Sequence, residues 1–157
     1  MNTADRAEFF KLLQDDIQET DMWTNLVPAH DDLSETLRVM MPVTDEGDPC
    51  LLEIMTSSFV EEADMLIFYT TMIAKIGPGY EDLFSAVSDW NVECPLGLFG
   101  IYKTPEMNQL YHKYTLLFDL DTDPEELEDI AMFHLMLIYE VVSRKYKEAR
   151  SISDGKA

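Results

Sequence analysis

Hydrophobic residues recur along this chain at two spacings, which separate predicted helices from predicted strands. One amphipathic helical stripe runs over Ala4–Glu19, and a second helix of about three turns begins at Tyr80. A third and longer helix is expected to run to about Lys147. It begins after Asp123, which can cap it, and Pro124 suits its first turn because proline lacks the N–H that would have no helical partner there.

Five further segments alternate apolar and polar residues with the period of two that is typical of strands. They are Thr36–Val43, Cys50–Phe59, Met65–Ile76, Leu96–Lys103 and Gln109–Asp119. The polar stretch Thr20–Ser34 is expected to be a loop, with a strand as the alternative. Short connections between neighbouring strands favour antiparallel pairing. The sequence therefore predicts a two-layer α+β fold with an antiparallel five-stranded sheet, in the order α-β-β-β-α-β-β-α. Residues 1–150 should form this single domain and residues 151–157 a flexible C-terminal tail.

Composition and charge narrow the classes of partner. The 157 residues are 46% hydrophobic, which suits one globular domain, and their formal net charge is −20. Such a charge repels phosphate, so we expect neither nucleic-acid nor anionic-membrane binding.

The longest apolar-rich window, 130–142, is shorter than the ~20 residues of a membrane span. The first residues lack the features of a signal peptide, so a cytoplasmic location is expected. Cys50 and Cys94 form no CxxC motif, and two thiols are favoured over a disulfide.

One acidic segment imitates a calcium site. Asp119, Asp121 and Asp123 match the first three ligand positions of an EF-hand loop, but Pro124 stands where glycine is needed and Ile130 where the bidentate glutamate is needed. The acidic pairs Asp15-Asp16, Asp31-Asp32 and Glu61-Glu62 lie in polar surroundings and are interpreted as solvated surface. We therefore expect no metal site here.

The sequence also lacks recognisable catalytic and cofactor-binding motifs. It contains no GxSxG, HExxH or glycine-rich phosphate loop. His30 lies in a polar stretch and should be exposed. His112 alternates with apolar residues of a strand and His134 shares an apolar face of the last helix, so both should point inward. A lone histidine on an apolar face is more often a hydrogen-bonded core residue than a ligand. No catalytic, cofactor-binding or metal-binding residue is therefore predicted.

The order of elements resembles the type III secretion chaperone-like (CesT-type) fold, particularly its YbjN-like branch. Asp89–Asn91, the sequence DWN at the end of the middle helix, is similar to the asparagine–tryptophan helix end of that branch. The following strand pair and long apolar helix are also similar to it. The resemblance implies a small, acidic, bacterial protein, usually dimeric, that holds segments of partner proteins. YbjN-like proteins are themselves linked to stress and regulation.

More apolar surface is predicted than one core requires. On the last helix, one stripe faces the sheet, while Met132, Phe133, Met136 and Tyr139 point elsewhere. Either another element such as the first helix covers this second stripe, or it binds a second copy or a partner. The strand Cys50–Phe59 also carries apolar residues on both faces. Either helices cover both sides of the sheet, or part of it is an interaction surface.

Two functions from different classes remain. The first is a non-enzymatic protein-binding module, chaperone-like or regulatory, that forms a homodimer and uses Met132, Phe133, Met136 and Tyr139. If that stripe is the dimer interface, Met136→Glu should shift the protein toward monomer. The alternative is a small-ligand-binding protein or an enzyme with a pocket between the sheet and the last helix. Its candidate residues are Trp90, Tyr111, His112, Tyr114 and His134.

Overall fold

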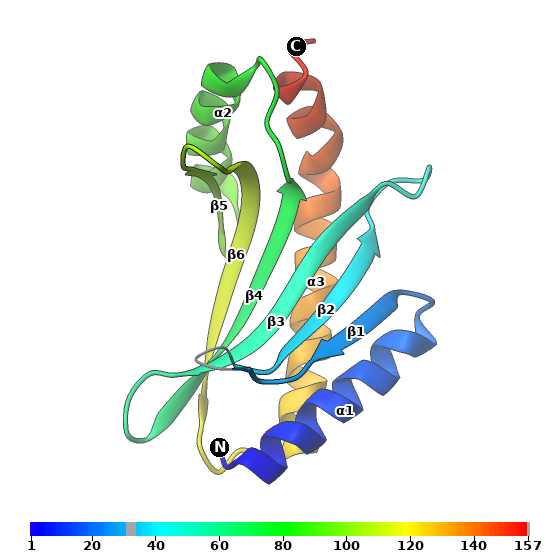
Figure 1. Cartoon of the computed structure of the whole chain (residues 1–157), viewed down its shortest axis with the longest axis vertical. Helices are drawn as coiled ribbons and strands as arrows, with labels where there is room; N and C mark the ends of the chain where they lie inside the picture. The colour runs from blue at the N-terminus through cyan, green and yellow to red at the C-terminus, as the bar shows by residue number, and fades with distance from the viewer. Residues whose placement is uncertain (31–33, 157) are drawn as a thin grey trace.

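A computed structural model describes residues 1–30 and 34–156, and the pair Asp31-Asp32 lies outside these described residues. Three helices and six strands make up the described part of the chain (Figure 1). Their order along the chain is α1 (Thr3–Glu19), β1 (Trp23–Val27), β2 (Thr36–Pro42), β3 (Pro49–Ser58), β4 (Ala63–Ile73), α2 (Tyr80–Glu93), β5 (Leu98–Lys103), β6 (Asn108–Asp119) and α3 (Pro124–Ser153).

The strands form one open antiparallel sheet in the order β1-β2-β3-β4-β6-β5. The α+β class and the antiparallel pairing are confirmed, but the prediction of five strands is wrong. The sixth strand, β1, lies inside the stretch Thr20–Ser34. Asp21, with a φ of 63°, turns the chain after α1, and β1 then pairs along the whole of its length with β2. This strand was hard to recognise in a polar stretch of sequence, because only Thr24 and Leu26 of β1 face the core.

All three helices pack on the same face of the sheet, so the fold has two layers. α1 lies against β1, where the side chains of Gln14 and Gln18 both donate to the hydroxyl of Thr24. α2 lies against β5, where Asn91 exchanges two hydrogen bonds with the backbone of Phe99. α3 crosses behind the sheet in the view of Figure 1 and contacts α1, α2, β4 and β6.

The core fills the space between the helices and this inner face of the sheet. Alternation placed the inner residues of β2, β3 and β6 correctly, since Leu37, Val39, Leu52, Ile54 and Leu110 are all buried. α1 contributes Phe9, Phe10, Leu13 and Ile17, and α3 contributes Leu127, Ala131, Leu135, Ile138 and Val142. The N-cap of α3 is as expected, because the Asp123 carboxylate accepts from the backbone N–H of Glu125 at 2.9 Å.

The C-terminal end of α3 differs from the prediction. The helix continues past Lys147 to Ser153, so residues 151–153 are not part of a flexible tail. Both Ile152 and Ser153 are buried. The backbone N–H of Gly77 donates to the Ser153 hydroxyl and that of Gly79 to its carbonyl, each at 3.0 Å. The glycines before α2 thus form the docking site for the end of α3, a contact that no local pattern reveals.

Candidate functional site

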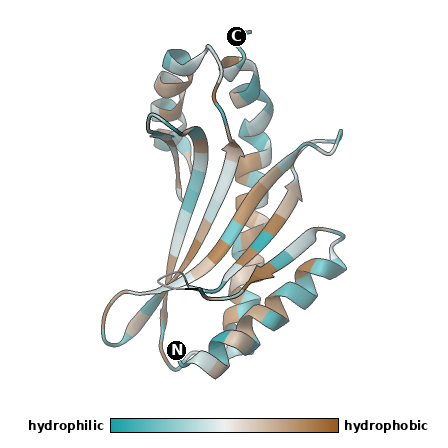
Figure 2. Ribbon diagram, viewed as in Figure 1, coloured by the Kyte–Doolittle hydropathy of each residue, from teal (hydrophilic) through white to brown (hydrophobic). Residues whose placement is uncertain are grey.

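The outer face of the sheet, opposite the helices, carries many apolar side chains. No helix of the described chain packs against it, and Figure 2 shows hydrophobic residues along the strands that face the viewer. Exposed sheet faces are normally polar. Here the strand residues that point outward include Trp23, Met40, Leu51, Met55, Met65, Ile67, Tyr69, Leu98, Tyr102, Tyr111 and Leu117. Trp23, Tyr102 and Leu117 expose at least half of their accessible surface. We call this surface the outer sheet face.

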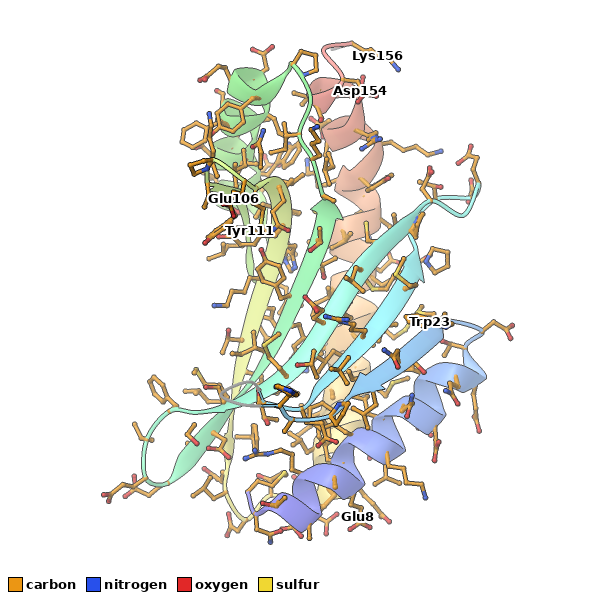
Figure 3. The ribbon with its side chains drawn as sticks, in the orientation of Figure 1. Glu8, Trp23, Glu106, Tyr111, Asp154 and Lys156 are labelled. Atoms are coloured by element: carbon orange, nitrogen blue, oxygen red, sulfur yellow. The ribbon has the colours of Figure 1, made fainter. Side chains whose placement is uncertain are left out.

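An aromatic cluster occupies one side of the outer sheet face. The rings of Tyr69 on β4 and Tyr111 on β6 stack with centroids 5.0 Å apart and an angle of 22° between their planes. Tyr111 also lies over Gly100 of β5, which leaves room for the ring because it has no side chain. Burial raises the pKa of the Tyr69 hydroxyl to about 12, and the nearby Tyr111 and Glu53 add to the shift. Figure 3 shows Tyr111 near one side of the sheet and Trp23 near the other.

The outer sheet face has little of the acidity of the chain. Its charged strand residues are Arg38, Glu53, Lys113 and Asp119, whose formal charges sum to zero, on a protein with a net charge of −20. Arg38 Nε donates to a carboxylate oxygen of Glu53 at 3.0 Å across the β2–β3 pair. Lys113 has no ion-pair partner among the described residues. Most of the acidic groups of the protein therefore lie outside the outer sheet face.

A small cavity adjoins the outer sheet face near one end of β2 and β3. It has a volume of about 220 Å³ and is bordered by Pro28, His30, Arg38, Glu53 and Met55. His30 is exposed, as expected. Pro28 and His30 thus border the outer sheet face at this corner.

The four residues predicted to bind protein from α3 do not form one continuous surface. Phe133 and Met136 are exposed, at 62% and 45% of their accessible surface. Met132 and Tyr139 instead pack partly against the core. The hydroxyl of Tyr139 donates to the carbonyl of Pro42 at 2.9 Å, which ties it to the end of β2. Other elements of the same chain therefore partly cover Met132 and Tyr139, which was one of the two alternatives, whereas Phe133 and Met136 remain exposed.

The histidines do not converge on a pocket. His112 has no exposed surface, and its Nε2 donates to the carbonyl of Leu96 at 2.7 Å. Burial lowers its pKa. His134 is half-buried, donates from Nδ1 to the Ile130 carbonyl at 2.8 Å and stacks on Tyr114 with centroids 5.2 Å apart. Both have the structural roles expected of lone histidines on apolar faces.

The pocket candidates of the alternative function are likewise dispersed. Tyr111 lies on the outer sheet face, opposite His112 and Tyr114. Trp90 packs edge-on against Phe99 and lines a cavity of about 160 Å³ between α2, β5 and α3, together with Arg144 and Lys145. Pockets for small ligands commonly enclose about 300 Å³ or more. Lys145 is paired with Glu148 at 3.4 Å and lies near the Trp90 ring, so its charge is already partnered.

One acidic pair was missed from sequence. Glu128 in the first turns of α3 is 7% exposed and lies beside Asp16 of α1. Burial, together with the charge of Asp16 and a hydrogen bond to it, raises the pKa of Glu128 to about 7. The two residues are 112 positions apart, and the packing of α1 on α3 alone brings them together. Asp15 and Asp16 are themselves exposed, as are Glu61 and Glu62, so the buried member of this contact is Glu128.

Within residues 1–30 and 34–156, no three histidine, cysteine or acidic side chains gather as a metal site would require, and both cysteines are free thiols. Over the same residues, no helix combines the length and apolarity needed to cross a membrane.

In comparisons of the sequence with known proteins, no family model matches the chain and no curated protein matches it.

Proposed function

We propose that this protein is a non-enzymatic protein-binding module, chaperone-like or regulatory, and that it binds through the outer sheet face. The observation that carries the proposal is the set of apolar side chains on a face that no described helix covers. Contiguous apolar patches on a protein surface commonly mark sites of interaction with another protein. Interfaces also favour tyrosine, tryptophan and methionine, which this face supplies with Tyr69, Tyr111, Trp23 and Met55.

The charge distribution supports the same proposal. The strand residues of the outer sheet face carry no net charge, although the chain carries −20. Charged residues are depleted at the centres of protein interfaces, because removing a charge from water costs free energy. A surrounding acidic surface would keep the protein soluble and would oppose non-specific contacts elsewhere. Binding at this face therefore does not require burial of the acidic groups.

We also propose that the protein is similar in function to YbjN-like and type III secretion chaperone-like proteins, which its sequence resembles. That resemblance implies partner binding and a cytoplasmic location. Its support is the order of elements, in which α1 precedes the first strands, α2 separates two groups of strands and α3 follows the last one. β1 is one strand more than the resemblance led us to expect. The exposed residues Phe133 and Met136 of α3 are a second candidate contact within this proposal.

A photo-crosslinking experiment tests the proposal. A benzophenone amino acid replaces Thr115, which is exposed on the outer sheet face between Ile67 and the sheet edge. The control position is Ser88, exposed on α2. After irradiation in cells, mass spectrometry identifies the adducts. We expect specific protein adducts, to another protein or to a second copy, from position 115 and not from position 88. Equal adducts from both positions, or none from position 115, would contradict the proposal.

A further inference from the structure

Three of the four charged strand residues of the outer sheet face lie in one row across the sheet, and the fourth, Asp119, pairs with Ala63 at the end of β6. Cross-strand pairing aligns Arg38 on β2 with Glu53 on β3, Glu53 with Tyr69 on β4, and Tyr69 with Lys113 on β6. Neighbouring strands are about 4.8 Å apart. Glu53 and Lys113 therefore lie at nearly equal distances on either side of Tyr69, with opposite charges. The rows on both sides of this one are apolar or uncharged at the same strands, with Leu51, Thr71 and Tyr111 in one row and Met55, Ile67 and Thr115 in the other.

From this pattern we infer that a second copy of the chain binds face to face on the outer sheet face, about a two-fold axis that runs along β4 over Tyr69. The inference rests on the proposed function, since it names the partner of the same face. A two-fold axis in this direction exchanges the strands on its two sides. It places Lys113 of each copy over Glu53 of the other and brings the two Tyr69 side chains together at the centre. Leu51 of each copy then faces Tyr111 of the other.

The charge pattern distinguishes this arrangement from the alternative symmetric one. A two-fold axis at right angles to β4, along the charged row, would place Glu53 over Glu53 and Lys113 over Lys113. Like charges brought together in an interface oppose binding. Of the two axes, the one along β4 thus places opposite charges of the two copies against each other. The face carries no net charge, so the net charge of −20 on each copy is not concentrated at the contact.

The available area fits a stable dimer. The roughly 50 strand residues of the sheet, at about 3.3 Å per residue and 4.8 Å per strand, span about 800 Å². A standard protein interface buries about 800 Å² on each partner. Sheets that pack face to face do so at about 10 Å with apolar side chains interdigitated, and this face supplies such side chains on all six of its strands. The outer sheet face is therefore wide enough to hold a second copy without a contribution from α3.

The test exploits the fact that Lys113 has no ion-pair partner among the described residues. In Lys113→Glu, the new carboxylate would face Glu53 of the second copy at two symmetric positions. The matched control is Lys11→Glu on the exposed surface of α1, which changes the net charge equally. The rescue variant combines Lys113→Glu with Glu53→Lys, and circular dichroism and urea unfolding report whether each variant remains folded.

Sedimentation equilibrium at 0.15 M salt measures the dimer dissociation constant of each variant. We expect the wild type to sediment at twice the 18.1 kDa chain mass. Lys113→Glu should raise the dissociation constant about tenfold or more. Lys11→Glu should leave it within about threefold, and the double variant should recover most of the loss. A wild type that stays monomeric at 0.1 mM, or equal effects of Lys113→Glu and Lys11→Glu, would overturn the inference. Adducts to a different protein from position 115 would then still uphold the proposed function.

Discussion

The ring of Tyr111 occupies the space in which a side chain at Gly100 would lie. Any side chain at this position would collide with the ring of Tyr111, which in turn stacks on Tyr69. The glycine on the edge strand β5 therefore determines the position of the aromatic cluster on the outer sheet face.

Gly100→Ala should destabilise the protein by about 1–3 kcal/mol, because the added methyl group forces Tyr111 out of its rotamer. Urea unfolding measures the free-energy change. The control is the same substitution in a Tyr111→Ala background, where the clash is absent and the cost should fall below about 0.5 kcal/mol. A similar cost in both backgrounds would show that the backbone at Gly100, and not the ring, sets the requirement.

Gly79→Ala should reduce the free energy of unfolding more than the loss of a single hydrogen bond at the C-terminus of α3 does. The φ of Gly79 is −81°, so alanine is not strained by its backbone. Its Cβ would instead collide with the carbonyl of Ile152. We expect a loss of about 2–4 kcal/mol, whereas Ser153→Ala should cost about 1 kcal/mol by removing the acceptor for the Gly77 N–H. Urea unfolding gives both values, and the reverse order would contradict this account.

These two glycine contacts illustrate what the sequence could not predict. The faces of β2, β3 and β6 follow from alternation, and the N-cap of α3 follows from Asp123 and Pro124, because each is a local pattern. The end of α3 depends on Gly77 and Gly79, which are more than 70 positions away. The placement of all three helices on one face of the sheet likewise depends on how the strands are connected across the whole sheet, which is not a local pattern. The sequence therefore suggested surplus apolar surface on both α3 and the sheet, but it could not show that Tyr139 of α3 is tied to Pro42.

The carboxyl of Glu128 should make the stability of the protein decrease as the pH rises. Its pKa in the folded protein is about 7, above the ordinary value of 4.5 that applies when the chain is unfolded. Folding therefore takes up a proton between these values, so the stability contribution is fully present below about pH 4.5 and is lost as the pH rises through 7. Each pKa unit corresponds to about 1.4 kcal/mol, so the total effect is at most about 3 kcal/mol.

Urea unfolding at pH 5 and pH 8 checks this prediction. Glu128→Gln cannot ionise, so it should gain stability relative to the wild type at pH 8 and should narrow the difference between the two pH values by about 2 kcal/mol. Glu126→Gln is the matched control, because Glu126 is an exposed carboxylate in the first turn of the same helix. Asp16→Asn should act in the same direction as Glu128→Gln, since it removes the charge that opposes ionisation of Glu128. An unchanged pH dependence in Glu128→Gln would refute the role of this carboxyl.

Two charged substitutions should separate the two apolar surfaces of the protein. Ile67→Glu places a carboxylate near the centre of the outer sheet face, next to Met55 and Thr115 in the register of the sheet. Met136→Glu places one on the exposed side of α3. If the second copy binds over β4, Ile67→Glu should shift the protein to monomer in light scattering, because each copy would bury an unpaired charge. Met136→Glu should leave the mass unchanged. Circular dichroism must show folded protein in both cases. Dissociation by Met136→Glu alone would instead place the interface on α3, together with Phe133, as the sequence first suggested.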